Sequence, residues 1–282
     1  MRIFVTGWNG KLGRALREVL GEVHDVHGMD IEDGDICDQS LWRKKMDPFH
    51  PDAVAHLAAM TAVDRCETAV DEAFRVNGEG SRRAAIEAER LDIPILAVST
   101  DYVFDGRKTS PYTEDDPTAP LSVYGRSKLA GEEAVKTASL AWTIVRSAWL
   151  YGKGGPNFVE TIIDLLGTQE TVSVVDDQTG SPTYALDLAR GIRTLLETRA
   201  RGIFHVVNAG QASWFELARE IARQKGLDVD RVIPTSTSEM GRPAPRPVYS
   251  VLSPQRARAK HGVELRSWPD ALEAYIAKRD VA

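Results

Sequence analysis

The chain contains 282 residues, of which 27% are charged, and its net charge at neutral pH is -6. This mild acidity leaves no basic surface for nucleic acid or an anionic membrane, and no apolar run approaches the ~20 residues of a membrane span. The segment after Met1 has no signal-peptide pattern, and Cys37 and Cys66 are too few for a disulfide framework and lack metal-ligand spacing. We therefore expect reduced thiols, a cytoplasmic location, and neither a nucleic-acid nor a membrane partner.

The N-terminal segment predicts a strand, a glycine-rich turn and a helix in direct succession. Arg2 to Thr6 has the apolar character of a short buried strand, and the pattern G-x-x-G-x-x-G follows it. Glycines here let the backbone turn tightly and approach a pyrophosphate, whose charge then lies at the helix N-terminus. We therefore expect a nucleotide-phosphate loop rather than a plain glycine turn. Its cofactor-binding residues are Gly7, Asn9, Gly10, Lys11, Leu12 and Gly13.

The second expected strand, His24 to Met29, ends at an acidic residue. Asp30 lies about 20 residues past the glycines, where a carboxylate accepts hydrogen bonds from an adenosine ribose and favours NAD over NADP. The alternative is a loop aspartate in an acidic run. Because Lys11 or Arg14 could accept a 2'-phosphate, we expect use of both NADH and NADPH. Two candidates for an adenine contact, or for an ordinary turn, are Asp35 and Ile36.

A third strand is expected at Ala53 to Leu57, followed by a loop of small residues that would let a nicotinamide ribose lie close to the backbone. The candidate cofactor contacts here are Leu57, Ala58, Ala59 and Thr61. His56 lies inside the apolar strand, so we expect a core histidine rather than a catalytic one. A long helix follows from about Val70 to Arg90. Its interior Asn77 is either held by a specific hydrogen bond or faces solvent.

The residues with the clearest chemistry follow the apolar run Ile93 to Val98, which predicts a buried strand. Ser99 and Thr100 lie at its C-terminal end, where open α/β sheets bind ligands, so Ser99 is a further cofactor candidate. Tyr124 and Lys128 are four residues apart in a predicted helix and therefore share one face. A neighbouring ammonium favours a phenolate, which suits general acid/base work on a carbonyl or alcohol. A surface tyrosine beside a solvated lysine is the alternative for that pair alone.

The alternation of strands and helices predicts a Rossmann-like α/β fold with a doubly wound parallel sheet. With a strand at Trp142 to Arg146, residues 1–150 form the expected NAD(P)-binding domain. Residues 151–282 form mainly a smaller α/β substrate-binding region whose chain crosses back to the first domain. The elements expected there are helices at Phe158 to Gly167, Tyr184 to Glu197, Trp214 to Lys225 and Ser267 or Trp268 to Lys278, and strands at Thr171 to Val175 and Ile203 to Val207.

Two irregular segments in the second half could bind a ligand. Asp176 to Thr183 is polar and rich in turn residues, which suits either a binding loop or a connector. Arg242 to Pro247 is kept extended by its prolines. Its arginines could grip a diphosphate bidentately, or could be solvated charges in a linker.

Taken together, these motifs resemble the extended short-chain dehydrogenase/reductase superfamily and, within it, the dTDP-4-dehydrorhamnose reductase family. The glycine loop and Tyr-x-x-x-Lys are shared by the superfamily, whereas Ser-Thr-Asp-Tyr-Val-Phe-Asp-Gly and Asp-Gln-x-Gly-x-Pro-Thr are more specific. The resemblance covers nearly the whole chain: Gly7 to Gly13, Asp35-Ile36, Leu57 to Asp64, Ser99 to Gly106, Tyr124 to Glu132, Arg146 to Trp149, Asp177 to Thr183, and Arg246-Pro247 with Ser250.

The resemblance implies reduction of a dTDP-4-keto-6-deoxysugar, with NADPH or NADH as hydride donor. It implies that Tyr124 protonates the developing alkoxide, that Lys128 lowers the tyrosine pKa and holds the nicotinamide ribose, and that Thr100 hydrogen-bonds the reacting oxygen. The implied substrate-binding residues are Thr61, Val63, Thr100, Asp101, Tyr102, Trp149 and Arg246. Related dehydratases carry Asp-Glu after the threonine, where this chain has Asp101-Tyr102, so reduction is expected rather than dehydration.

Some members of the family bind Mg²⁺ at a dimer interface through two glutamates, whose matching positions here are Ala15 and Leu186. Mg²⁺ is therefore doubtful, no metal site is expected, and both a monomer and a homodimer stay open. The favoured product is dTDP-L-rhamnose, made from dTDP-4-dehydro-6-deoxy-L-mannose. The alternatives are a reductase of a different 4-keto sugar nucleotide, or a non-catalytic regulatory subunit similar to the methionine adenosyltransferase beta subunit.

Overall fold

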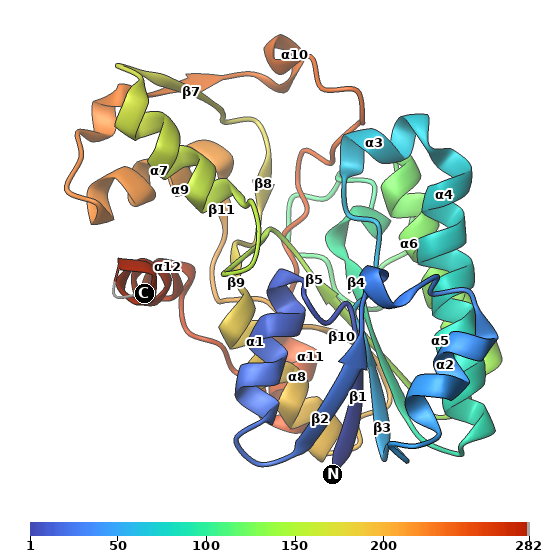
Figure 1. Ribbon diagram of the computed structural model, residues 1–282. Helices are drawn as coiled ribbons and strands as arrows, with labels where there is room; N and C mark the ends of the chain where they lie inside the picture. The colour runs from blue at the N-terminus through green and yellow to red at the C-terminus, as the bar shows by residue number, and fades with distance from the viewer. Residues whose placement is uncertain (281–282) are drawn as a thin grey trace.

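The computed structural model describes residues 1–280, and a six-stranded parallel sheet lies at its centre (Figure 1). The strand order is β10-β5-β4-β3-β1-β2, so the order reverses next to β1. The strands are β1 Arg2–Thr6, β2 Asp25–Met29, β3 Ala53–His56, β4 Ile95–Thr100, β5 Trp142–Ser147 and β10 Gly202–His205. All five neighbouring pairs are parallel. The predicted Rossmann-like α/β class is thus confirmed, because parallel neighbours need the crossover helices that the sequence alternation supplies.

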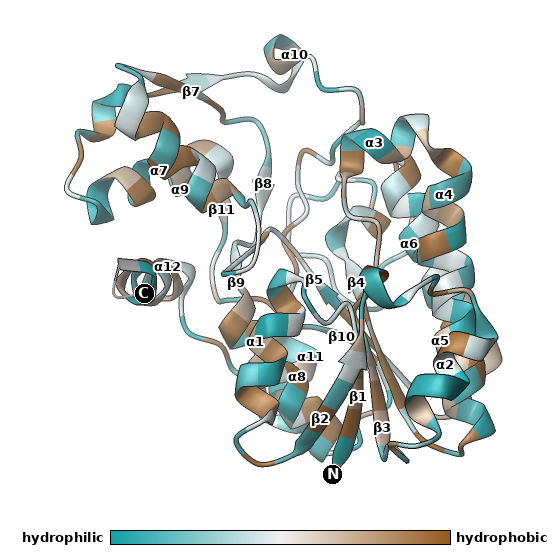
Figure 2. Cartoon of the chain, in the orientation of Figure 1, coloured by the Kyte–Doolittle hydropathy of each residue, from teal (hydrophilic) through white to brown (hydrophobic). Residues whose placement is uncertain are grey.

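Helices cover both faces of the sheet because successive side chains of a strand point to opposite sides. On β1, Ile3 and Val5 pack with Leu16 of α1 on one face, whereas Phe4 packs with Trp42 of α2 on the other. Figure 2 shows hydrophobic residues along the strands and hydrophilic ones on the outward turns of the helices. The first layer holds α1 Lys11–Leu20, α8 Ala185–Glu197 and α11 Gln255–His261, and the second holds α2 Gln39–Met46, α5 Gly80–Arg90 and α6 Val123–Ala138.

A smaller lobe of helices and two-stranded pairs lies beside the C-terminal edge of the sheet (Figure 1). Its helices are α7 Phe158–Thr168, α9 Trp214–Gln224, α10 Thr237–Met240 and α12 Trp268–Asp280, with a 3-10 turn η4 at Val229–Arg231. Its pairs are β7 Val172–Val175 with β12 Val232–Thr235, β8 Thr179–Gly180 with β11 Ala212–Ser213, and β6 Leu150–Tyr151 with β9 Thr183–Tyr184. The second half of the chain also contributes α8, α11 and β10 to the sheet and its covering layer. The boundary between two domains near residue 150 stays a prediction.

The expected long helix from Val70 to Arg90 is not uniform. It consists of α4 Val70–Phe74, a π-helical segment η2 at Arg75–Glu79, and α5. The preceding loop contains α3 Val63–Thr68, and 3-10 turns follow two strands at η1 Ile31–Asp33 and η3 Asp101–Val103. The other predicted ends are unchanged or move by one or two residues, as is usual for frayed termini. No helix within residues 1–280 is long and apolar enough to cross a bilayer.

Candidate active site

The glycine-rich turn after β1 has the geometry of a phosphate-binding loop. Gly7 has φ +71°, and a Cβ there would lie 2.9 Å from the Ala58 nitrogen, while a Cβ on Gly13 would lie 2.1 Å from the Gly7 oxygen. These close approaches exclude a side chain at both positions. Gly10 caps α1 without any side-chain hydrogen bond, and the first turn of the helix holds no acidic residue. The helix N-terminus with Lys11 and Leu12 therefore offers backbone N–H groups and a positive dipole end to a pyrophosphate.

Asp30 lies at the end of β2 and is hydrogen-bonded to the glycine-rich turn. Its carboxylate accepts the backbone N–H of Asn9 and, at 2.7 Å, that of Ile31. The Arg14 guanidinium donates to the Asn9 oxygen at 2.8 Å, and the Lys11 ammonium donates to the Pro156 oxygen at 2.9 Å. A carboxylate and two cations thus border the same turn, which fits an adenosine ribose with or without a 2'-phosphate.

The other adenine candidates lie on the loop between η1 and α2. Asp35 forms an ion pair of 2.5 Å with Arg75, and hydrogen bonds from Cys37 and Arg75 lower the pKa of its carboxyl. The Ile36 oxygen accepts the indole N–H of Trp42 at 2.7 Å. These contacts fix the loop at the edge of the expected cofactor site.

Thr6, the last residue of β1, fixes the start of the loop after β3. Its hydroxyl oxygen accepts the N–H groups of Leu57 and Ala58 at 3.2 Å each and is bonded to His56 Nδ1 at 2.8 Å. The other ring nitrogen of His56 meets the Ser81 hydroxyl at 3.1 Å, and burial lowers the histidine pKa to about 3. His56 is therefore a neutral core residue, as the sequence predicts.

The side chain of Asn77 fixes the rest of that loop. It is fully buried, accepts the Met60 N–H at 2.8 Å, and donates to the Met60 oxygen at 3.1 Å and the Ser127 hydroxyl at 2.9 Å. The first of the two sequence alternatives, a specific hydrogen bond, is thus correct. Asn77 lies in the π-helical segment, a feature that is frequent at functional sites, and it ties the loop that holds Ala59 and Thr61 to α6.

Thr100, Tyr124 and Lys128 come together where β4 meets α6. Thr100 ends β4, and the Ser122 side chain caps α6 by accepting the Gly125 N–H at 3.1 Å, which places Tyr124 in the first turn. The Thr100 hydroxyl lies near enough to the Tyr124 phenol to lower its pKa. One turn further along, the buried Lys128 ammonium donates to the Val98 oxygen at 2.8 Å. Ser99 is buried beside Thr100 on the same strand.

The electrostatics of this trio differ in one respect from the sequence expectation. Burial raises the pKa of the Tyr124 phenol, and the group that lowers it is the Thr100 hydroxyl rather than the Lys128 ammonium. Burial lowers the pKa of Lys128 to about 8, opposed by the charge of Glu132 one turn away. Tyr124 is thus a proton donor at neutral pH, and Lys128 is a cation that titrates close to the physiological range.

Asp101 and Tyr102 directly follow Thr100 and contact this trio. The Thr100 hydroxyl donates to Asp101 Oδ1 at 2.9 Å and accepts the Tyr102 N–H at 3.2 Å. Burial raises the pKa of Asp101 to about 6, although hydrogen bonds with Ser250 and Thr100 act in the other direction. The Tyr102 and Tyr124 rings meet edge to face with centroids 5.6 Å apart.

Of the remaining sugar-side candidates, Arg246 is brought close to this cluster. Its guanidinium donates to Asp64 Oδ2 at 3.0 Å and acts to lower the pKa of the Tyr102 phenol, against the larger effect of burial. Arg242 lies 3.6 Å from the same carboxylate and is more than half exposed. The predicted arginine pair is therefore anchored at α3 and is not a free linker. Thr61 and Val63 lie on the segment that leads to Asp64, and Trp149 follows β5 at the same sheet edge.

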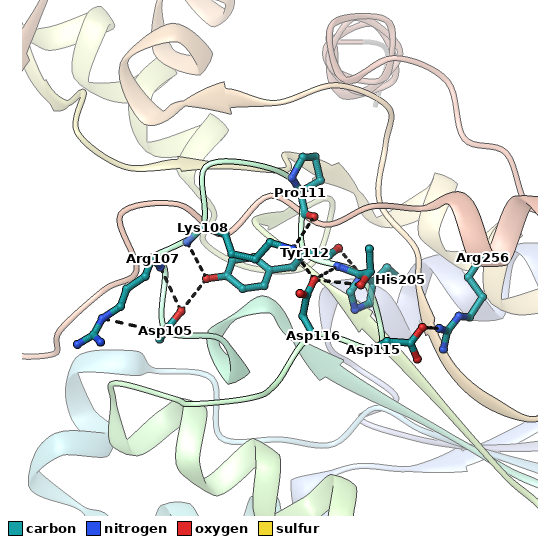
Figure 3. Close-up of polar contacts among 10 residues, drawn as sticks. Asp105, Arg107, Lys108, Pro111, Tyr112, Asp115, Asp116, His205 and Arg256 are labelled. Carbon is teal, nitrogen blue, oxygen red and sulfur yellow. Dashed lines mark hydrogen bonds and ion pairs between the residues drawn. The ribbon is translucent and has the colours of Figure 1, made fainter.

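The loop after η3 is braced against the sheet (Figure 3). Tyr112 stacks on Phe104 with centroids 4.2 Å apart and donates its hydroxyl to Asp105 at 2.7 Å. Its backbone oxygen is bonded to His205 Nδ1 of β10 at 3.1 Å, and Lys108 forms a 2.6 Å ion pair with Asp116. These contacts fix the loop that follows Asp101 and Tyr102 against β10.

The positions that match the metal-binding glutamates of the resembled family are apolar. Ala15 of α1 and Leu186 of α8 both pack against the main hydrophobic core. In the part of the chain that the structure describes, no group of three or more His, Cys, Asp or Glu side chains is placed to hold a metal ion.

Sequence reasoning missed several supporting residues. Thr6 could have been noted because it directly precedes the glycine-rich turn. Ser127 and Trp214 carried no local signal, because their contacts are with residues 50 and 65 positions away. We expected Trp149 at the sugar pocket, but the sequence did not indicate its stacking partner Trp214.

The comparisons with known proteins agree with these features. The family described as "RmlD substrate binding domain" matches residues 1–281. The dTDP-4-dehydrorhamnose reductase of Streptomyces griseus is 43% identical over 278 residues, which cover 96% of this chain and 91% of that protein. The spore coat polysaccharide biosynthesis protein SpsK of Bacillus subtilis is 41% identical over 282 residues, which cover 100% and 99%.

A solved structure gives the same result. The dTDP-4-dehydrorhamnose reductase of Bacillus anthracis in complex with NADP superposes with a TM-score of 0.95 at 39% identity, covering 98% of this chain and 99% of that one. The resemblance expected from the motifs is confirmed, and the chain belongs to the RmlD substrate-binding-domain family.

Proposed function

We propose that the protein catalyses the NAD(P)H-dependent reduction of the 4-keto group of dTDP-4-dehydro-6-deoxy-L-mannose to dTDP-L-rhamnose. The observation that carries the proposal is the meeting of the Thr100 hydroxyl and the Tyr124 phenol at the end of β4, with Lys128 one helical turn away. This edge lies beside the point where the strand order reverses, where α/β sheets bind ligands. The names of the relatives supply the sugar nucleotide as substrate.

The mechanism assigns one task to each side chain. The glycine-rich turn and the N-terminus of α1 would hold NAD(P)H, and the bound cofactor would supply the hydride for C4 of the sugar. Tyr124, neutral because burial raises its pKa, donates its proton to the oxygen of that carbonyl as negative charge develops there. Thr100 hydrogen-bonds the same oxygen and fixes its position. Lys128, one helical turn from Tyr124, orients the nicotinamide ribose.

Both cofactors enter the proposal. Asp30 provides the ribose contact that favours NADH, whereas Arg14 and Lys11 border the same turn and can accept the 2'-phosphate of NADPH. The adenine contacts Asp35 and Ile36, the ribose contacts Leu57, Ala58, Ala59 and Thr61, and the nearby Ser99 complete the cofactor site. The sugar site consists of Thr61, Val63, Thr100, Asp101, Tyr102, Trp149 and Arg246.

The rest of the proposal concerns the setting of the enzyme. We place it in the cytoplasm, as a monomer or a homodimer without a nucleic-acid partner. The net charge of -6 and the two cysteines without a disulfide support this setting.

The test is the oxidation of NADH and NADPH with dTDP-4-dehydro-6-deoxy-L-mannose, with identification of the product. Wild type should turn over, and Tyr124→Phe should lose about 10³-fold in kcat while its cofactor Kd stays unchanged. Tyr102→Phe is the matched comparison, since its ring contacts Tyr124: as a residue of the sugar site and not the proton donor, it should change KM for the sugar nucleotide and leave kcat nearly unaffected. Cofactor-bound wild type without turnover would overturn the proposal in favour of another 4-keto sugar or a regulatory role.

A further inference from the structure

Trp149 has an unusual backbone conformation for a large side chain. It lies between β5 and β6 with φ +46°, a left-handed conformation that is strained for a residue with a Cβ. Ser147, two residues earlier, pairs in register with Thr100, so the indole follows directly after the catalytic edge of the sheet. The contacts around Trp149 must hold this conformation in place.

The main contact is a second indole from the lobe. The Trp149 and Trp214 rings are stacked, with centroids 3.6 Å apart and planes 5° apart. Phe158 of α7 packs against Trp214 at 4.5 Å, and the Trp214 N–H donates to Gln178 Oε1 at 3.3 Å. A Cβ on Gly180 would lie 2.3 Å from the Trp149 ring, so only a glycine leaves room for this indole.

Backbone contacts join the same three segments. The Thr183 N–H donates to the Trp149 oxygen at 3.2 Å, and Thr179 pairs with Ser213, the residue before Trp214. The Ser250 N–H donates to the Thr179 oxygen at 2.8 Å. The polar loop from Asp177 to Thr183 has no role in the mechanism above. Its contacts hold the segments of Trp149 and Trp214 together.

We propose that Trp214 is a positioning residue for the sugar: it fixes the indole of Trp149 as a wall of the sugar pocket, with the Asp177 to Thr183 loop as its frame. The inference rests on the proposed function, which assigns Trp149 to that pocket. Removal of Trp214 frees the strained Trp149 to turn, so the affinity for the hexose falls. The cofactor site, which Trp214 does not contact, keeps its affinity.

The experiment compares Trp214→Ala, Trp214→Phe and a matched control, Phe215→Ala. Phe215 is the neighbouring aromatic on α9 and packs with Arg219. Binding of NADPH, dTDP and dTDP-L-rhamnose is measured by calorimetry on each. Trp214→Ala should weaken dTDP-L-rhamnose about tenfold and leave dTDP and NADPH unchanged, the loss expected for one aromatic pair. Trp214→Phe should recover affinity to within about threefold, because it restores a stacking ring.

Two results would overturn the inference. One is unchanged affinity of Trp214→Ala for dTDP-L-rhamnose, and the other is an equal loss for dTDP and dTDP-L-rhamnose, which would indicate a diphosphate or a general structural effect. Failure of the proposed function gives a different result, because wild type would then bind no dTDP-L-rhamnose. The circular-dichroism couplet of the stacked indoles, present in wild type and absent from both Trp214→Phe and Trp149→Phe, checks the stack without any ligand.

Discussion

The cofactor side and the sugar side of the site are built in different ways. On the cofactor side most groups are held by neighbours in their own strand-turn-helix unit or in an adjacent element, such as Asp30 by Asn9 or Lys128 by Val98, and Lys11, which is bonded to the Pro156 oxygen, is an exception. On the sugar side the partners are remote in sequence, since 182 positions separate Arg246 from its partner Asp64. The sugar side is therefore complete only when the segment that holds Arg246 lies against α3.

This difference separates two kinds of expected defect. A change on the cofactor side should alter turnover, cofactor binding or the stability of the sheet. A change on the sugar side should alter the constants for the sugar nucleotide and leave the cofactor unaffected. The variants below test that separation.

The largest effect is expected from Lys128→Met. Removal of the ammonium should lower kcat by about 10³-fold. The same variant should be more stable at pH 7, by on the order of 2 kcal/mol, because burial lowers the pKa of Lys128 to about 8 from an unfolded value near ~10.4. The Lys128 amine therefore binds its proton more tightly in the unfolded chain than in the folded one. The charged lysine destabilises the folded state by the full amount below pH ~8 and no longer does so above pH ~10.4.

The difference in unfolding free energy between Lys128→Met and wild type should therefore decrease as the pH rises from ~8 to ~10.4. Urea unfolding at pH 7 and pH 10 measures it. A methionine variant that is less stable than wild type at pH 7 would show that the hydrogen bond to the Val98 oxygen outweighs the cost of burying the charge.

The second effect is on the sugar side. Arg246→Ala should raise KM for the sugar nucleotide about 30-fold, because in the proposed site it removes a charge-assisted contact to the diphosphate and leaves the Asp64 carboxylate to repel it. The Kd of NADPH should not change. Arg242→Ala is the matched control, since this arginine approaches the same carboxylate but is more than half exposed, and its effect should stay below about threefold. A parallel loss of NADPH affinity in Arg246→Ala would contradict the separation of the two sides.

The third effect is a pH dependence. Asp101 has a pKa of about 6 because of burial, and its carboxylate accepts the Thr100 hydroxyl. As pH falls through 6 the carboxylate is protonated and that acceptor is weakened, so kcat/KM of wild type at pH 5 should be about a tenth of its value at pH 7. Asp101→Asn keeps an acceptor oxygen and does not titrate, so its profile should be flat over the same range. If kcat/KM falls equally at low pH in wild type and in Asp101→Asn, a group other than Asp101 causes the fall.

The same contrast explains how far the sequence could be interpreted. The glycine turn, Asp30, and the pair Tyr124 and Lys128 could be predicted, because strand-turn-helix geometry and helical spacing act over a few residues. The fold class followed from the alternation of those units.

Contacts between remote segments could not be predicted. The sequence could not decide whether Asn77 faces solvent or makes a specific hydrogen bond, because its partner Met60 belongs to a different element. It also could not decide whether the arginines of the proline-rich segment bind a diphosphate or are solvated in a linker. Nothing in the sequence indicated that Trp214 stacks on Trp149. Such contacts depend on how the lobe docks, which no local periodicity encodes.

The smallest effect tests the cofactor side at its most local contact. Asp30→Asn keeps one acceptor oxygen, which can serve either the η1 cap or the Asn9 N–H, and it removes the negative charge that opposes a 2'-phosphate. We expect the ratio of kcat/KM for NADPH to that for NADH to rise about fivefold, with KM for the sugar nucleotide unchanged. Glu32→Gln, which neutralises the neighbouring carboxylate bonded to the Asn9 side chain, should shift the ratio less. Equal shifts in both variants would mean that the summed acidity of this turn selects the cofactor, and no shift in Asp30→Asn would remove Asp30 from that role.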